Sequence, residues 1–433
     1  MKRKAIIVWI VLLVSLLAVG CNSEGTDGAK EKKGAEPAEL TLWVAGNSKE
    51  IQKTFKEVVD AFNKEYEAEN IRAKVQFEPW SELDQKLTTS LVGGVGPDVF
   101  MHGAAAAASL ANENQIESLK KYYDSWDDKD DFVEAYVESG KVNDEPYIVP
   151  IQGANRMMYY RKDIFEEAGV EVPETWDELL KISKKLVKKD GDRFKQAATE
   201  LPREGNDLQQ VWSMFLWSNN GDFLNEEGTE SVLNRPEAVE ALEYYKKFFD
   251  DGLTPISGMS GQGDQHPLGT GEVAFTFDGV WVIEQVQNYT PDAYDLIDVA
   301  VPPRGKGETT THVGSSGFFM NANSKHKDAA WKLMAFLGSK ENVEKISREL
   351  KFLPVRESTA QADFIKEDKL FAKFVELSAT TNGMSNPNVP GWTTMRDIIA
   401  SHVEKAIYGQ VPAEEALKQA HKAINEEIQK NKK

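Results

Sequence analysis

The chain has 433 residues, which is long for one domain and predicts two or three domain-sized units. Apolar residues make up 41% and charged residues 28%, a globular balance that excludes disorder and collagen-like structure. The formal net charge of −19 argues against nucleic acid as a partner, because nucleic-acid binding requires a basic surface. The single cysteine excludes a disulfide scaffold and a cysteine-based zinc cluster.

The N-terminus has the pattern of a secretory signal. Basic residues at 2–4 precede an apolar run over 5–19, which is shorter than the roughly 20 residues of a membrane-spanning helix. Small residues then lead to Cys21, so that residues 1–20 resemble a signal peptide with a bacterial lipobox. We expect the mature chain to begin at Cys21 and to carry a lipid anchor there, of the diacylglyceryl and palmitate type. A plain signal peptide with an incidental cysteine is the alternative.

The segment after the cysteine indicates a tether. Residues 21–38 are rich in Gly, Ala, Lys and Glu without an apolar cluster, which predicts a flexible linker. No later segment approaches transmembrane length. We therefore expect a folded domain anchored by lipid to the extracytoplasmic face of the cell membrane. Such a tether is commonest where no outer membrane confines a receptor, which favours a Gram-positive source.

Strands and helices alternate through the first part of the folded chain, which indicates an α/β unit with a largely parallel sheet. Ligands of such sheets bind beyond the carboxyl ends of the strands, so the loops after Val44 and Met101 are the first expected site. The expected elements are a strand over 39–44, a helix over 51–66, a strand over 73–77, a helix opening with a capping box at 81–84, and a strand over 97–101.

The later part of the chain predicts a crossing and further helices. Residues 147–160 mix β-prone residues with Pro and Gly, which suits a strand that crosses between domains. A capping box at 175–178 predicts a helix that continues to Leu186. Residues 257–271 lack the order of a phosphate-binding loop and are expected to form an ordinary loop. Helical periodicity returns over 327–337 and through most of the C-terminal segment.

The sequence contains few signs of catalytic or metal chemistry. No two of the six histidines are four residues apart, so we expect no metal site, and no motif calls for a cofactor. No nucleophile-elbow motif occurs, and no pair of carboxylates stands out as a glycosidase pair. The acidic run over 124–131 lacks the glycine and glutamate of an EF-hand and is interpreted as a solvated loop.

Tryptophan is the informative excess, with ten in the chain. Sugar rings have apolar C–H faces and polar rims, which aromatic rings and polar side chains bind together. Trp281 and Trp392 lie in turn-rich, Gly-containing settings, which favours ligand contact, although core packing is the usual role of a tryptophan. Trp176 and Trp331 lie on helical faces and are expected in the core.

An ordered set of segments resembles extracellular solute-binding protein family 1, the carbohydrate-binding lipoproteins of ABC importers related to maltose-binding protein. The resemblance covers about 390 residues in the family's order. It rests on LTLWVAGN (40–47), GGVGPDVF (93–100), YIVPIQG (147–153), YYRKDIFEEAGVEVPETWDELL (159–180), GEVAFTFDGVW (271–281), NANSKHKDAAWKLMAFLGS (321–339), FLPVRES (352–358) and the Trp-x3-Arg pair at 392–396.

The resemblance implies an α/β, two-lobed, periplasmic-binding-protein-like type II fold with hinge strands and a ligand cleft. Lobe one is then 38–151 plus 316–353, and lobe two is 152–315 plus 354–433. Residues carried over by their place in the motifs give these expected ligand contacts: Asn47, Ser48, His102, Gln152, Asn155, Gln209, Trp212, Asp278, Trp281, Ser315, Ser316, Trp392 and Arg396. His102 stands where maltose-binding protein has an aromatic residue.

The function expected from the resemblance is capture of a sugar, an oligosaccharide in particular, by closure of the lobes and its delivery to the transmembrane subunits of an ABC permease. We expect a monomer. Two alternatives stay open: the same fold with another small solute (a peptide, a polyamine or a metal complex), and a secreted glycan-degrading enzyme. The sequence leaves the identity, length and linkage of the sugar open.

Overall fold

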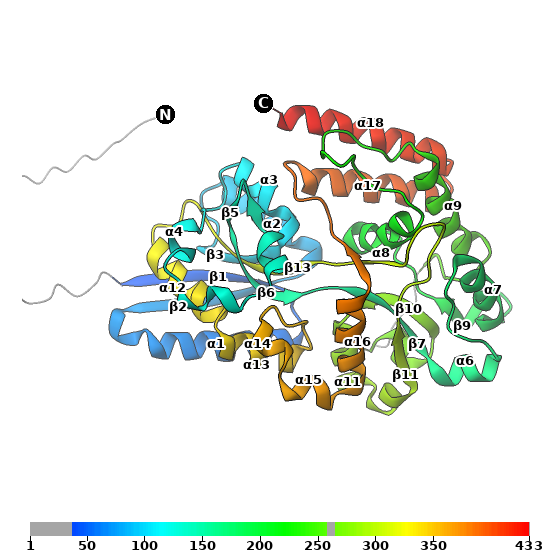
Figure 1. Ribbon diagram of the computed structural model, residues 1–433, viewed down its shortest axis with the longest axis horizontal. Coiled ribbons are helices and arrows are strands. Elements are labelled where there is room, and N and C mark those ends of the chain that lie inside the picture. The colour runs from blue at the N-terminus through cyan, green and yellow to red at the C-terminus, as the bar shows by residue number, and fades with distance from the viewer. Residues whose placement is uncertain (1–36, 258–264, 433) are drawn as a thin grey trace, which may run out of the picture. The chain divides into compact units, whose positions relative to one another are not determined.

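The computed structural model describes residues 37–257 and 265–432. Contacts group residues 37–433 into one compact unit, which is built on two five-stranded sheets (Figure 1). The expected signal peptide, the lipidation site Cys21 and nearly all of the linker lie outside the described residues. Their assignment therefore stays a prediction.

The first sheet has the strand order β2-β1-β3-β13-β6. β1 pairs in parallel with β2 and β3, whereas β13 is antiparallel to β3 and β6. Leu40, Leu42 and Val44 of β1 are fully buried, which explains the alternation in the sequence. The strands are β1 Ala38–Ala45, β2 Ile71–Glu78, β3 Val99–Gly103, β6 Ile148–Gly153 and β13 Ser315–Met320.

Helices on the first sheet share one apolar core with it. They are α1 Lys49–Glu65, α2 Trp80–Val92, α12 Lys327–Leu337 and α13 Lys340–Leu350. Trp331 of α12 packs against this core and stacks on Tyr122, with ring centroids 4.9 Å apart. The predicted helix over 51–66 and the strands over 73–77 and 97–101 are all present, with ends shifted by a few residues.

The second sheet has the order β11-β7-β10-β9-β8, with β10 parallel to β9 and antiparallel to β7. Its strands are β7 Arg156–Arg161, β8 Lys188–Asp190, β9 Arg193–Thr199, β10 Val273–Gly279 and β11 Ile297–Ala300. Met158 and Tyr159 of β7 belong to two different core clusters, because successive side chains point to opposite faces. The central strands of this sheet are therefore buried on both faces, whereas the edge strand β8 is exposed.

Two sets of helices cover these faces. The larger core includes α6 Lys162–Ala168, α7 Trp176–Leu186, α8 Gly205–Ser218, α9 Pro236–Asp250, α17 Trp392–Ile407 and α18 Ala413–Asn431. The smaller core includes α11 Trp281–Tyr289, α15 Asp363–Glu367 and α16 Lys369–Thr380. Trp176 packs against the larger core and stacks on Tyr244 at 4.3 Å between ring centroids, as expected for a core residue.

Short elements complete the description. The acidic run over 124–131, expected as a loop, contains the mostly exposed 3-10 helix η3. The short elements are α3 Ala107–Asn112, α4 Lys120–Tyr123, α5 Glu134–Glu138, α10 Pro267–Thr270, α14 Glu357–Ala360, β4 Lys141–Val142, β5 Glu145–Pro146, β12 Thr310–His312, β14 Asn382–Met384, η1 Glu67–Glu69, η2 Ala104–Ala106, η3 Asp127–Asp131 and η4 Pro291–Leu296.

The two predicted capping boxes have different outcomes. Thr175 caps α7 and Glu178 completes the reciprocal box, as predicted. The box expected at 81–84 is wrong, because α2 begins one residue earlier at Trp80 and has Pro79 at its N-cap without a side-chain cap. Ser81 is therefore already inside the first turn.

Three chain segments lie side by side where the two sheets meet. Residues 147–160 form β6 in the first sheet and β7 in the second, so this segment crosses from one sheet to the other (Figure 1). The Gly153 amide donates to the Leu353 carbonyl (3.0 Å), and the Ala154 amide donates to the Gly314 carbonyl (2.8 Å). A Cβ at position 153 would collide with the Tyr136 hydroxyl, which explains the glycine there.

The predicted lobe boundaries lie beside these three segments and stay a prediction, with one detail to correct. Residues just after 353 were assigned to lobe two. Val355 belongs to the core of the first sheet, and the fully buried Arg356 donates two hydrogen bonds to the Gly338 carbonyl. The chain thus stays with the first sheet through α14 before it reaches α15.

Gly317 allows β13 to pack closely against the backbone of its neighbouring strand β6. A Cβ there would collide with the backbone carbonyl of Val149 and lie 2.8 Å from the Pro150 Cα. We expect Gly317→Ala to reduce the free energy of unfolding by about 1–3 kcal/mol, since neither backbone atom can turn away. Gly103→Ala is the matched control in the same sheet, because its nearest contact is 4.0 Å away. Urea unfolding of both variants measures the effect, and equal midpoints would contradict it.

Candidate functional site

The register of the first sheet brings several expected ligand contacts to one edge. Ser316 lies opposite Gly103 of β3 on one side and Gln152 of β6 on the other. Asn47 and Ser48 follow the carboxyl end of β1, and His102 is the residue before the last in β3. This carboxyl edge is where parallel α/β sheets bind ligands.

The second sheet presents its own cluster at the start of β7. Arg156 pairs with Gly279 at the end of β10, and Asp278 and Trp281 flank that glycine in sequence. Asn155 immediately precedes Arg156 and is 4% exposed. The antiparallel pairing therefore joins the crossing segment to the Asp-Gly-Val-Trp motif.

Arg156 is the centre of this cluster, although sequence reasoning did not select it. Its side chain is only 3% exposed, yet it carries a permanent charge. The guanidinium donates to Asp207 of α8, to Asp278 (3.2 Å) and to Gln210 (2.8 and 3.0 Å). A buried charge is tolerable only when paired in this way.

The charge of Arg156 also orients Trp281. The guanidinium carbon lies 5.1 Å from the indole centroid, a cation–π geometry. A Cβ at position 279 would collide with the indole ring, so Gly279 is what allows the ring to fold back over the end of β10. The glycine of the motif is thereby explained by close approach, not by backbone torsion.

Asp278 is held in its charged form. Burial alone would raise the pKa of its carboxyl, but the hydrogen bond with His266 (3.3 Å) and the charge of Arg156 outweigh burial and lower the pKa. The carboxylate therefore accepts hydrogen bonds throughout the physiological pH range.

These residues line a cavity of about 300 Å³. It combines the aromatic rings of Trp281 and Phe277 with charged and polar groups, which is the composition expected of a site for a polar molecule with apolar faces. The lining residues are Arg156, Glu200, Leu201, Pro202, Arg203, Glu204, Asp207, His266, Pro267, Val273, Thr276, Phe277, Asp278 and Trp281. Of the thirteen expected ligand contacts, Asp278 and Trp281 are in this set.

Two other expected contacts, both on the crossing segment, contain buried acceptors without a protein partner, and Gln209 Oε1 in the core of the second sheet is a third such acceptor. Gln152 Oε1 and Asn155 Oδ1 are both buried and receive no hydrogen bond. Leaving such an atom unpaired costs about 1–3 kcal/mol, so native proteins rarely do it without reason. Both atoms lie on the crossing segment and are suited to accept from a ligand hydroxyl.

Arg396 and His102 both contact the carboxylate of Asp84, a residue that the sequence pattern indicated only as part of a helix start. Arg396 donates to Asp84 (2.9 Å), and His102 Nε2 lies 2.8 Å from the other oxygen of Asp84. Burial would raise the pKa of Asp84, but His102 and Arg396 outweigh it and lower the pKa. Since Asp84 is on α2 and Arg396 is on α17, this ion pair joins the helices of the two sheets.

The serines have structural partners as well. Ser48 caps α1 by accepting from the Ile51 amide (3.2 Å), and Ser315 is hydrogen-bonded to Ser139 (2.8 Å). The side chain of Asn47 is exposed beside Ser48. Ser316 is buried at a register shift of β13. Their role in ligand binding stays a prediction.

Trp212 and Trp392 require a correction. Both were expected to contact the ligand, but they are 0% and 1% exposed and belong to the larger core of the second sheet. Each packs against Phe223, with ring centroids 6.1 and 5.5 Å apart respectively. The structure therefore favours core packing for both rings. Gln209 is fully buried beside them and donates to Asn386 (2.9 Å).

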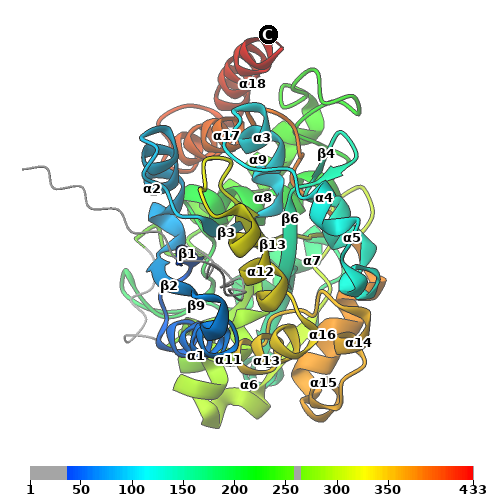
Figure 2. The same ribbon diagram turned by 90° about the vertical axis from the view of Figure 1, so that its left-hand side faces the viewer.

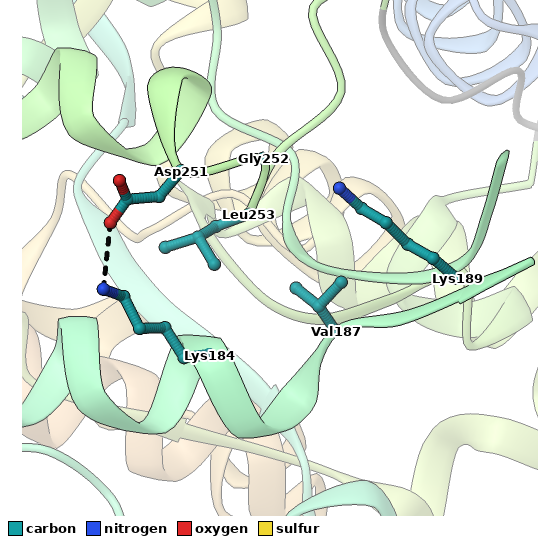
Figure 3. Close-up of a pocket in the computed structure, with 6 residues that line it drawn as sticks. All are labelled: Lys184, Val187, Lys189, Asp251, Gly252 and Leu253. Atoms are coloured by element: carbon teal, nitrogen blue, oxygen red, sulfur yellow. Dashed lines mark ion pairs between the residues drawn. The ribbon is translucent and has the colours of Figure 1, made fainter. Parts of the chain in front are cut away.

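A second cavity lies between the end of α7, β8 and the segment that follows α9. Figure 3 shows its lining residues Lys184, Val187, Lys189, Asp251, Gly252 and Leu253, which enclose about 440 Å³. Lys184 and Asp251 form an ion pair across it (3.0 Å). None of the expected ligand contacts lines this cavity, and we assign it no ligand.

Within residues 37–257 and 265–432, no group of three or more His, Cys, Asp or Glu side chains is arranged to hold a metal ion. In the same part of the chain no helix is both long and apolar enough to cross a bilayer.

Comparison with known proteins identifies the family. The family model for bacterial extracellular solute-binding proteins matches residues 45–344, and the chain belongs to this family. A putative binding protein of Brucella abortus (strain 2308) is 29% identical over 393 residues, covering 89% of this chain and 92% of the relative. The arabinooligosaccharide-binding protein of Bacillus subtilis (strain 168) is 25% identical over 376 residues, covering 85% and 83%.

The fold agrees with this assignment. The maltose-bound MalE3 of T. maritima superimposes with a TM-score of 0.79 at 25% identity, covering 89% of this chain and 99% of that structure. The predicted two-lobed, type II solute-binding fold and the predicted family are thereby confirmed. The family and these relatives are binding proteins rather than enzymes.

A contact between α1 and α11 contains two acidic side chains. The Tyr289 hydroxyl donates to Glu50 (2.9 Å), and both helices lie against α13 (Figure 2). Glu284 of α11 is 9% exposed. Burial raises the pKa of Glu284 to about 7, and the negative charge of Glu50 adds to the increase.

The stability of the chain should therefore depend on the protonation of Glu284. Between the ordinary pKa near 4.5 and the folded value near 7, the folded chain holds a proton that the unfolded chain releases. The free energy of unfolding then falls as the pH rises through this window, by on the order of 2–3 kcal/mol. We expect Glu284→Gln to match the original chain at pH 5 and to exceed it at pH 8.

Urea unfolding at pH 5, 6.5 and 8 measures this difference. Glu243→Gln, at an exposed position of α9, is the control and should leave the pH profile unchanged. Parallel profiles for Glu284→Gln and the original chain would contradict the prediction.

Proposed function

We propose that the chain is the extracytoplasmic substrate-binding component of an ABC importer and that its ligand is a sugar, an oligosaccharide in particular. The observation that carries the proposal is Trp281, a partly exposed indole that lines a cavity together with Asp278 and Arg156. An aromatic face beside charged hydrogen-bonding groups matches the two surfaces of a sugar ring. The names of the relatives, which bind arabinooligosaccharides and maltose, support the same class.

Binding would act through lobe closure. A ligand that contacts residues of both sheets stabilises the arrangement in which they are close, since it shifts the equilibrium by its differential affinity. Asp278, Trp281, Asn155 and Arg156 are the second sheet's contacts in this proposal. Gln152, with Ser316 beside it, is the first sheet's contribution.

The delivery step requires a membrane partner. We propose that transmembrane subunits of an ABC permease receive the sugar, and that a lipid on Cys21 holds the monomeric receptor at the outer face of a Gram-positive cell membrane. The receptor performs no reaction on the sugar and uses no cofactor. Incubation of the mature chain with the bound sugar tests this point, because stoichiometric recovery of intact sugar is expected and turnover would indicate the enzyme alternative.

A ligand screen tests the proposal directly. A thermal-shift series with arabinose, galactose, maltose and the trisaccharides of each is expected to raise the unfolding midpoint for at least one sugar, because ligand binds only the folded chain. Calorimetry then gives the affinity and stoichiometry. No response to any sugar, together with a response to a peptide or polyamine, would overturn the proposed ligand class.

Trp281 should contribute strongly to that affinity. We expect Trp281→Ala to weaken binding of the identified sugar by about 10- to 100-fold, corresponding to about 1.5–3 kcal/mol for a buried aromatic contact. Trp281→Phe retains a ring and should lose less. Isothermal titration calorimetry measures both, and equal affinity of Trp281→Ala and the original chain would remove Trp281 from the site.

A further inference from the structure

Trp80 is an aromatic side chain that the fold leaves unusually exposed. It is 43% exposed, and Tyr408 at 41% is the other aromatic residue of comparable exposure among the described residues. Every other described tryptophan is buried or partly buried. Sequence reasoning did not select Trp80, and neither cavity includes it.

The position of Trp80 places it at the ligand edge of the first sheet. It is the first residue of α2, and β2 ends two residues earlier at Glu78. Glu78 lies opposite Ala45 of β1, and its carbonyl accepts from the Gly46 amide (2.8 Å). Trp80 therefore emerges from the same carboxyl edge as Asn47 and His102.

Neighbouring contacts hold this part of the edge in place. The Trp80 ring meets His102 edge-on, with centroids 6.4 Å apart and planes at 72°. His102 is itself fixed by Asp84, which lies four residues after Trp80 on the same side of α2. Asp84 also binds Arg396 of α17. The exposed indole thus stands beside the ion pair that joins the helices of the two sheets.

Trp80 and the partly exposed Trp281 come from different sheets. Trp281 comes from the second sheet and is oriented by Arg156, whereas Trp80 comes from the first sheet and is placed by His102. An indole face left in water at a sugar-binding edge is suited to the apolar face of a sugar ring. A ligand that covers both rings has to extend from one sheet to the other.

We propose that Trp80 is a second aromatic contact for the sugar, supplied by the first sheet, and that it selects an extended oligosaccharide over a single sugar unit. The inference rests on the proposed function and adds the residue that sets chain length. Trp281 with Asp278 and Arg156 binds one sugar unit, and Trp80 stacks on a unit farther along the same chain.

Calorimetry with arabinose and arabinotriose, galactose and galactotriose, and glucose and maltotriose tests the inference. For the series that the original chain binds, Trp80→Ala is expected to weaken trisaccharide binding at least 10-fold and monosaccharide binding less than twofold. Trp80→Phe should recover most of the loss. Tyr408→Ala, which removes an equally exposed ring at the far end of α17, is the matched control and should change neither affinity.

The outcomes are distinguishable. Unchanged trisaccharide affinity of Trp80→Ala would overturn the inference, because the ring would then make no contact with the sugar. An equal loss for monosaccharide and trisaccharide would also overturn it, because Trp80 would then not lie at the far unit. Failure of the original chain to bind any sugar of the three series would overturn the proposed function, and this inference with it. Urea midpoints equal to that of the original chain show that all three variants, Trp80→Ala, Trp80→Phe and Tyr408→Ala, are folded.

Discussion

The candidate site depends on the ion pairs made by the buried guanidinium of Arg156. The guanidinium stands at the first residue after the crossing between the sheets, where its charge has almost no access to water. Asp207 of α8 and Asp278 of β10 neutralise it, and Trp281 of α11 lies over it. Removing a partner of such a buried charge is destabilising, because the charge of Arg156 is then left less compensated. One side chain therefore fixes three separate elements relative to each other.

In the first sheet, the expected ligand contacts are positioned by strand pairing and not by a buried charge. Its edge is assembled by strand register, in which Ser316 lies between Gly103 and Gln152. β13 lies antiparallel between β3 and β6. A segment that begins at residue 315 is thereby placed next to strands from earlier in the chain. Backbone pairing arranges one half of the site, and buried charge arranges the other.

Much of this could be predicted from the sequence, but only where a local pattern is decisive. The alternation of Leu40, Leu42 and Val44 and the capping box at Thr175 are local signals, and the structure agrees with both. Trp281 and Trp392 have similar local settings, each close to a glycine. Trp392 is a core residue because distant residues such as Phe223 pack on it, whereas Trp281 lines the cavity. The roles of Arg156 and Asp84 could not be predicted from local patterns, because their partners Asp278 and Arg396 are many residues away along the chain.

The triple junction at 153–155, 313–314 and 353 has a mechanical consequence. A domain attached by one strand can swivel freely about that strand. Three segments that lie side by side and are joined by the Gly153–Leu353 and Ala154–Gly314 backbone hydrogen bonds resist torsion between the two sheets. The remaining soft motion is a bend across the three strands. The two sheets are therefore held in one rotational setting relative to each other, which a single connecting segment would leave free.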